Sequence, residues 1–450
     1  MPDAALPQRG VVERNGISPQ RNAMSEPVIV VHYHELWLKG GNRRFFLGKL
    51  HSALHRALAG LPVERIEQPG DRFLVRLAAG APLDQAIERV QHVFGIAYYA
   101  VARPVERDLE ALCRAAWDEV EPLQFSTFAV RARRSDKTFP HPSMQVESAV
   151  GRFLLEKLRD AGRDVRVRLR DPGLICHIEI TPGPLLVYAR KISGLGGLPP
   201  NTAGRITCLL SGGYDSAVGA YQMIKRGAHL SFVHFYGTGA RPGESSLHVA
   251  SGLTRVLTRY QFTAKLYRVP FEDIQREIVR YAPEAFRVLL YRRMMLRIAE
   301  IFARRERALA LVTGDSLGQV ASQTLRNLVA VDAAASMPVF RPLIGTDKME
   351  IMDLARRIGT YDISSEPFHD CCPVFLPRAP ELSASPEELD EAEAKLDLKA
   401  LIAQGVNGAT LEKFSYEAGR IEASEPCPLI SPDRRTPSPQ MSESRFLRDL

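Results

Sequence analysis

Residues 206–326 alternate short apolar runs with amphipathic stretches, and this alternation constrains the fold more than any other feature of the chain. The runs have the length of buried strands and lie at 206–210, 230–235, 265–269 and 309–313. Helices are expected at 217–226, 244–260, 271–279, 284–305 and 316–326. Because each crossover must pass over one face of the sheet, the pattern predicts an α/β domain with a doubly wound parallel sheet.

A glycine-rich corner, Ser211–Ser216, follows the first of these strands. Gly212 and Gly213 would let the backbone approach a phosphate, and Ser211 and Ser216 would offer hydroxyls to its oxygens. The start of the next helix adds free backbone amides. The spacing is neither the Walker pattern nor the dinucleotide fingerprint. It predicts a pyrophosphate-binding loop, and the alternative is an ordinary strand–turn–helix corner.

Polar groups also follow two other strands of the predicted sheet. His234-Phe235 and Gly314-Asp315 fall at strand ends, as does the Ser211–Ser216 corner. In open α/β sheets ligands bind outside the carboxyl ends of the strands, so we expect the three segments to converge on one site. Asp215 is a candidate ligand for Mg²⁺ or a helix cap.

The chain upstream contains two smaller α+β units. One has a β-α-β-α-β pattern typical of a ferredoxin-like domain. A segment with four Gly and two Pro, 194–204, marks the boundary before the large domain. We expect a disordered leader at 1–26, a ferredoxin-like domain at 27–104 and a second α+β unit at 105–193. The nucleotide domain is expected at 194–402, and an extension, disordered from about residue 428, at 403–450.

Basic residues cluster in the second α+β unit. Net charge is +7 and the isoelectric point is near 9.1, which permits a polyanionic partner. Alternate arginines on a strand share one face, where they could follow a phosphate backbone. The alternative is a solvated charged surface. The candidates for RNA binding are Arg131, Arg133, Arg134, Lys137, Arg166 and Arg168.

The six cysteines are scattered and include no CxxC pair, so they indicate neither a disulfide framework nor a zinc site. No apolar run reaches the roughly 18 residues that a membrane span requires. We therefore expect a cytoplasmic protein without a membrane partner.

Several longer motifs, together with the Ser211–Ser216 loop, match the sequence pattern of a known family. They include Tyr291-Arg292-Arg293-Met294-Met295, the run from Gly314 to Thr324, Asp347-Lys348 and Asp370-Cys371-Cys372-Pro373. Upstream, Glu35-Leu36-Trp37-Leu38-Lys39-Gly40 and Phe139-Pro140 belong to the same pattern. On these motifs, over residues 28–400, the chain resembles the bacterial tRNA 4-thiouridine synthetases (ThiI).

The resemblance implies ferredoxin-like and THUMP units ahead of a PP-loop ATP pyrophosphatase domain. It also implies ATP and Mg²⁺ as cofactors and tRNA as partner. ATP would adenylate O4 of a uridine, position 8 in the family, and a cysteine persulfide would deliver sulfur. The implied nucleotide contacts are Leu209, Leu210, Ser211, Gly212, Gly213, Asp215, Ser216, His234, Phe235, Arg292, Gly314 and Gln323. Lys348 would stabilise charge during adenylation.

The resemblance favours Cys372 as the sulfur carrier, with Cys371 second, although two adjacent thiols can also be buried packing groups. The sequence after Cys372 is too short and too polar for the rhodanese domain that some members carry. The resemblance then requires a cysteine desulfurase or a separate carrier as persulfide donor, with Cys371, Cys208 or an external thiol resolving the intermediate. Whether the protein forms a homodimer is left open by the sequence.

Two other functions fit parts of the sequence. A PP-loop enzyme could modify another tRNA base or an amide-type acceptor. A catalytically degenerate protein could bind RNA alone, but the complete Ser211–Ser216 loop argues against this.

Overall fold

The computed structural model describes residues 26–33, 35–237, 246–366 and 377–429. Two compact units make up the chain: Ala102–Ala189 belongs to one, and the other joins Ile29–Val101 to the residues from Arg190 onward. Cys371 and Cys372 lie outside the described residues. No helix of the described part is both long and apolar enough to cross a bilayer.

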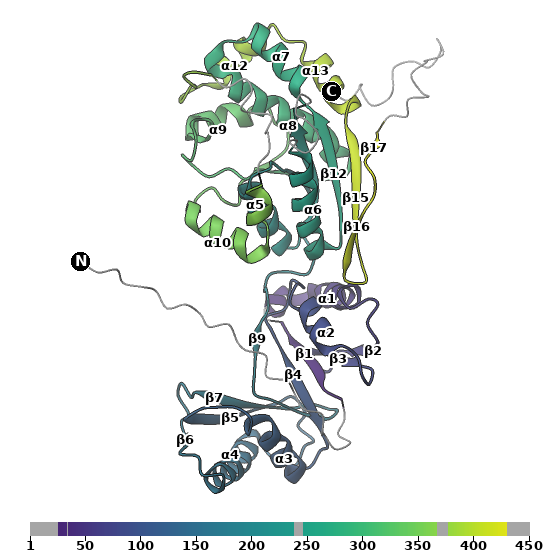
Figure 1. The fold of residues 1–450 in the computed structure, drawn as a ribbon, viewed down its shortest axis with the longest axis vertical. Helices are drawn as coiled ribbons and strands as arrows, with labels where there is room; N and C mark the ends of the chain where they lie inside the picture. Colours follow the sequence, from purple (N-terminus) through teal and green to yellow (C-terminus); the bar gives the residue numbers. More distant parts are fainter. Residues whose placement is uncertain (1–25, 34, 238–245, 367–376, 430–450) are drawn as a thin grey trace, which may run out of the picture. The chain divides into compact units, whose positions relative to one another are not determined.

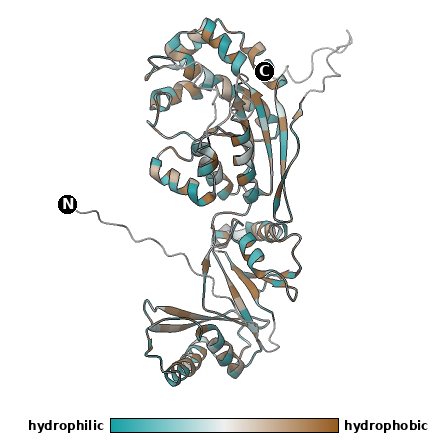
Figure 2. Ribbon diagram, in the orientation of Figure 1, coloured by the Kyte–Doolittle hydropathy of each residue, from teal (hydrophilic) through white to brown (hydrophobic). Residues whose placement is uncertain are grey.

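The N-terminal strands form a sheet in the order β2-β3-β1-β4 (Figure 1). Its elements are β1 (Val28–His32), η1 (Glu35–Asn42), α1 (Arg43–Ala57), β2 (Val63–Glu67), β3 (Arg72–Leu77), α2 (Leu83–Val90) and β4 (Tyr98–Val105). All five residues of β1 are buried, and β1 and β4 are largely hydrophobic in Figure 2. The ferredoxin-like prediction is confirmed, with β2 as an added antiparallel partner of β3.

The other unit is an α/β layer built on a mixed sheet. It consists of α3 (Leu109–Val120), β5 (Thr127–Arg134), α4 (Ser143–Asp160), β6 (Arg166–Val167), β7 (Leu174–Ile180) and β8 (Leu185–Tyr188). The strand order is β8-β7-β5-β6, and β5 runs parallel to both of its neighbours. β6 is only two residues long and forms the edge of the sheet.

The nucleotide domain confirms the doubly wound sheet. The strand order is β14-β13-β10-β11-β12-β15-β16, and all pairs from β14 to β12 are parallel. The parallel strands are β10 (Arg205–Leu209), β11 (His229–Tyr236), β12 (Thr263–Pro270), β13 (Leu311–Val312) and β14 (Val339–Phe340), and β9 (Ile192–Ser193) pairs instead with β4. Apolar clusters lie on both faces, because successive strand residues such as Phe232 and Val233 point to opposite sides.

Helices cover both faces of this sheet. They are α5 (Tyr214–Lys225), α6 (Leu247–Gln261), α7 (Glu272–Tyr281), η2 (Glu284–Phe286), α8 (Arg287–Arg305), η3 (Ala321–Gln323), α9 (Leu325–Asp332), α10 (Lys348–Ile358), α11 (Tyr361–Ser364), α12 (Pro386–Glu393) and α13 (Leu398–Asn407).

The helix expected at 316–326 is wrong. A loop with the short η3 occupies most of this stretch, and α9 begins at Leu325. Gly318 has a φ of +72°, and the Leu317 amide bonds to the Ile344 carbonyl, so the backbone leaves the helical path.

Residues 410–428, which the sequence analysis leaves outside the nucleotide domain, continue its sheet. β15 (Thr410–Glu417) pairs antiparallel with β12, while β16 (Arg420–Ala423) and β17 (Cys427–Pro428) pair with β15. These strands add the antiparallel edge that mixed α/β sheets often carry.

Candidate active site

The Ser211–Ser216 loop is held in shape by its own serines. The Ser216 hydroxyl accepts from the Ser211 amide at 3.0 Å and donates to the Gly213 carbonyl at 3.1 Å. The Gly213 amide donates to the Ser211 hydroxyl at 3.2 Å. Since Ser216 is buried, this network fixes the loop at the start of α5, whose first-turn amides have no acceptor within the helix. Such an arrangement suits an anion.

Gly314 brings a second strand end against this loop. It follows β13, which pairs parallel with β10. A Cβ on Gly314 would lie 2.5 Å from the Ser216 nitrogen and 2.7 Å from the Asp215 carbonyl carbon, distances that no real side chain allows. The close approach of the two backbones therefore requires glycine at this position.

A cavity of about 600 Å³ opens at these strand ends. Of the predicted nucleotide contacts, it is lined by Leu209, Ser211, Asp215, Ser216, Arg292, Gly314 and Gln323. The residues that do not line it are Leu210, Gly212, Gly213, His234 and Phe235. Leu210 and Phe235 pack in the cores on the two faces of the sheet. The buried His234 ring lies between the Leu210 carbonyl at 2.8 Å and the Ser246 hydroxyl at 2.7 Å.

Asp215 and Lys348, far apart in sequence, meet beside the cavity. The Lys348 ammonium lies 2.9 and 2.8 Å from the two carboxylate oxygens of Asp215. The Gln319 amide also donates to Asp215, at 3.0 Å. Lys348 begins α10, where Asp347 caps the helix through the Met349 amide. The Lys348 side chain is 41% exposed and so stays available to a ligand.

Asp315 organises the opposite wall, a role that the sequence analysis did not assign. Its buried carboxylate accepts from Thr313 at 2.7 Å, from Gln323 and the Arg341 Nε at 3.1 Å, and from Arg292. Burial would raise the pKa of the Asp315 carboxyl, but the charge of Arg292 and the bond from Thr313 more than offset this and lower it. The available signal was an aspartate directly after a strand-end glycine.

The thiol of Cys208 does not face the cavity. Cys208 is fully buried among apolar side chains, and this burial raises the pKa of its thiol well above its ordinary value. A thiol in such surroundings is a packing group. The described chain resumes after Cys372 with Pro377, and Pro377, Pro380 and Glu381 line the cavity.

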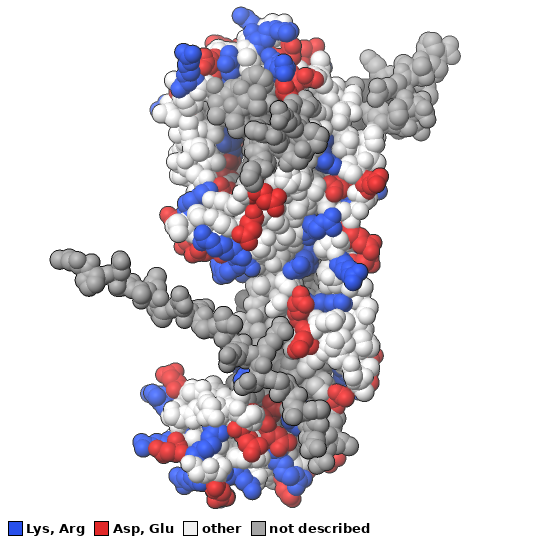
Figure 3. Space-filling model, viewed as in Figure 1, with Lys and Arg blue, Asp and Glu red and all other residues white. Residues whose placement is uncertain are grey.

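The six basic candidates for RNA binding all lie in the Ala102–Ala189 unit. Arg133, Lys137, Arg166 and Arg168 are exposed. Arg134 instead holds the following turn, through the carbonyls of Asp136, Lys137 and Phe139. Lys and Arg alternate with Asp and Glu on the face of this unit drawn in Figure 3, at the bottom of the view.

Comparison with known proteins gives matches along most of the chain. Family models match three stretches: a ThiI ferredoxin-like domain at 28–100, a THUMP domain at 106–189 and the thiamine biosynthesis protein (ThiI) at 201–398. A probable tRNA sulfurtransferase of Thermus thermophilus is 44% identical over 380 residues, which is 84% of this chain and 92% of the relative. The chain belongs to the ThiI family. A second family member, from Geobacillus kaustophilus, is 38% identical over 87% of this chain and 97% of its own length.

Solved structures support the membership in the ThiI family. A 4-thiouridine synthetase, crystallised with RNA and bound ATP, superposes with a TM-score of 0.78 and is 30% identical, over 86% of this chain and 99% of its own. PH1313 from Pyrococcus horikoshii has a TM-score of 0.57 over 74% of this chain and all of its own, and at 24% identity it bears on the fold alone.

Proposed function

We propose that this ThiI family member is an ATP-dependent tRNA sulfurtransferase that forms 4-thiouridine. The observation that carries the proposal is the cavity at the strand ends, where the Ser211–Ser216 loop, Gly314 and the Asp215–Lys348 pair come together. Relatives named as probable tRNA sulfurtransferases are similar in sequence to this chain over nearly their whole length.

The loop is proposed to hold the phosphates of ATP through the first-turn amides of α5. Arg292 and Gln323 line the cavity and are both oriented by Asp315. We assign them to the nucleotide. Because negative charge builds up on the α-phosphoryl oxygens and on the departing pyrophosphate as O4 attacks the α-phosphorus, we assign its stabilisation to Lys348 beside Asp215.

Asp215 is proposed as a ligand of Mg²⁺ carried in with the phosphates. Mg²⁺ bound with a nucleotide commonly takes one or two carboxylates and completes its shell with phosphate oxygens and water. The donor set here fits that type of site, because Asp215 offers a single carboxylate at the cavity beside the Ser211–Ser216 loop. The metal would supply charge neutralisation of the phosphates when bound.

The sulfur step is assigned to Cys372, with Cys371 as the second candidate. The terminal sulfur of a Cys372 persulfide would attack C4 as AMP leaves with the former O4. Cleavage of the S–S bond then requires a second thiol, which forms a disulfide with Cys372 that an external thiol reduces. Cys371 or an external thiol suits this role better than the buried Cys208. A cysteine desulfurase or separate carrier would regenerate the persulfide.

We assign tRNA binding to the THUMP unit, where Arg131, Arg133, Arg166 and Arg168 would contact phosphates. Such contacts position an RNA without reading its sequence. A cytoplasmic location is proposed as well. The described cysteines, Cys113, Cys176, Cys208 and Cys427, are all free thiols, as a reducing compartment favours.

The test is reconstitution with tRNA, Mg-ATP, cysteine and a cysteine desulfurase. We expect 4-thiouridine, detected by near-ultraviolet absorbance and nucleoside mass spectrometry, together with AMP and pyrophosphate. A protein that binds tRNA with salt-dependent affinity but forms none of these products would be a degenerate RNA binder. AMP release without 4-thiouridine, when the persulfide supply is verified, would point to another acceptor. Full activity of Cys372→Ser would move the carrier role to Cys371.

A further inference from the structure

A second cavity, of about 630 Å³, lies at the amino ends of the parallel strands, at the edge of the sheet opposite the Ser211–Ser216 loop. β10, β11 and β12 begin there with Arg205, His229 and Thr263. On this face of the sheet the apolar core includes residues further along the strands, such as Val233 and Tyr267. The first residues of these strands therefore form an open polar surface.

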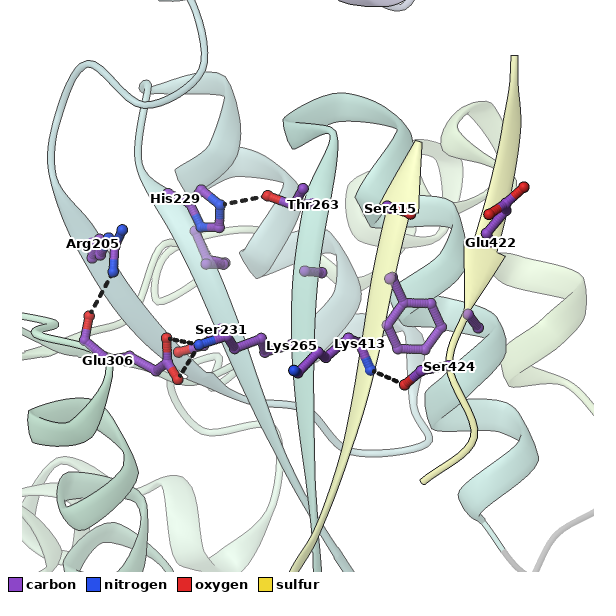
Figure 4. Close-up of a pocket in the computed structure, with 14 residues that line it drawn as sticks. Arg205, His229, Ser231, Thr263, Lys265, Glu306, Lys413, Ser415, Glu422 and Ser424 are labelled. Atoms are coloured by element: carbon purple, nitrogen blue, oxygen red, sulfur yellow. Dashed lines mark hydrogen bonds and ion pairs between the residues drawn. The ribbon is translucent and has the colours of Figure 1, made fainter. Parts of the chain in front are cut away.

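The lining side chains form two rows across the strands (Figure 4). One row contains Ser231, Lys265, Lys413 and Ser424, with Glu306 beside it, and the other contains Arg205, His229, Thr263, Ser415 and Glu422. The rows follow the strand register, because Thr263 lies opposite Ser415 and Lys265 opposite Lys413. Neighbouring strands thus supply hydroxyl, ammonium and guanidinium donors to this second cavity, which we call the basin.

Two lysines facing each other across β12 and β15 are an unfavourable arrangement. Glu306 offsets one of them, since its carboxylate lies 2.8 and 2.9 Å from the Lys265 ammonium and also accepts from Tyr267. Among the described residues no acidic side chain forms an ion pair with Lys413 or with Arg205. Positive charge without an ion-pair partner therefore faces the basin.

His229 gives a second sign of the local charge. Burial, together with the positive charges of Arg205, Arg56 and Lys265, lowers the pKa of this imidazole to about 4 against an opposite effect of Glu306. The ring is therefore neutral at pH 7, and its Nε2 lies 3.1 Å from the Thr263 hydroxyl.

We propose that this basin is a second anion site, which binds a phosphate group through Arg205, Lys265 and Lys413. Ser415 and Ser424 add hydroxyls at its rim. Glu422 is an exposed acidic side chain on β16, and its negative charge would repel a phosphate ligand. The volume accommodates a nucleotide-sized molecule, so the phosphate can belong either to a small molecule or to an RNA backbone. The site does not depend on sulfur transfer.

Inorganic phosphate is the first probe. The full chain is titrated with phosphate against chloride at equal ionic strength, and affinity is taken from the shift in Tm. We expect Lys413→Ala to weaken binding about fivefold and Glu422→Gln to strengthen it about twofold, as for single exposed charges. Lys399→Ala, an exposed lysine on α13, is the matched control and should leave affinity unchanged. Any binding at the Ser211–Ser216 loop is common to all variants and cancels.

The salt dependence of tRNA binding separates the two sources of phosphate. If an RNA phosphate occupies the basin, Lys413→Ala lowers the slope of log affinity against log salt by about 0.9, and Lys399→Ala does not. A free-phosphate site changes the first assay and leaves this slope intact. If Lys413→Ala and Glu422→Gln match the control in both assays, the proposal is overturned, whether or not the protein thiolates tRNA.

Discussion

Replacement of Gly314 by alanine tests the geometry of the active site most directly. The backbone of Gly314 has no positive φ, so alanine is conformationally allowed there, and the effect comes from contact alone. The new Cβ would meet the Ser216 nitrogen at 2.5 Å and its Cα at 2.6 Å. These are backbone atoms at the start of α5, which cannot rotate away as a flexible side chain can.

The size of the effect follows from the missing space. Ordinary contact begins at 3.4 Å, so the Ser211–Ser216 loop must retreat by about 0.9 Å. Overpacking of this kind costs about 1–3 kcal/mol of stability. A displacement of about 1 Å at a catalytic centre costs on the order of 100-fold in rate. We therefore expect kcat/KM for ATP to fall about 100-fold in a protein that is still folded.

The assay is pyrophosphate release with saturating tRNA and varied ATP, together with urea unfolding of the same preparations. Gly345→Ala is the matched control, because among the described residues no heavy atom lies within 4 Å of its added Cβ and its φ is not positive. That variant should keep full activity and unchanged or slightly raised stability. If Gly314→Ala retains kcat/KM within twofold of the parent, the close approach of the two strand ends is not what shapes the nucleotide site.

Three further outcomes follow from the structure. Asp315→Asn should lower the free energy of unfolding at pH 7. Because folding lowers the pKa of the Asp315 carboxyl, its contribution to stability is complete above the pKa of the unfolded chain, and the difference between parent and variant should shrink as pH falls through the folded pKa. A difference that does not change with pH in urea titrations would contradict this. Lys348→Ala should slow pyrophosphate release at least tenfold with little change in Tm, since the Lys348 side chain is 41% exposed. An unchanged rate of pyrophosphate release would show that Lys348 takes no part in the chemistry. Combined Arg133→Ala and Arg168→Ala substitutions should weaken tRNA binding and lower its salt slope by about 1–2 while ATP affinity stays the same; an unchanged slope would mean that these arginines face elsewhere.

The sequence was sufficient for the fold class, because hydrophobic periodicity reports which residues each strand and helix must bury. The sequence predicted secondary structure less well where hydrogen bonds of the backbone determine the course of the chain. The stretch 316–326 has the composition of a helix, yet the bonds of Leu317 and the positive φ of Gly318 make it a loop. The strands after residue 410 were missed because edge strands carry mixed polar patterns that resemble an extension.

The active site shows the same division. From the sequence, the strand-end positions predicted that Ser211–Ser216 and Gly314 lie at one site, and the family resemblance added Lys348. Only the tertiary structure pairs Lys348 with Asp215, makes Asp315 the acceptor for Arg292, Gln323 and Arg341, and withdraws the His234 side chain into the core. These contacts join residues from different strand ends and loops. Their formation depends on how the sheet and its loops pack, which no local pattern encodes.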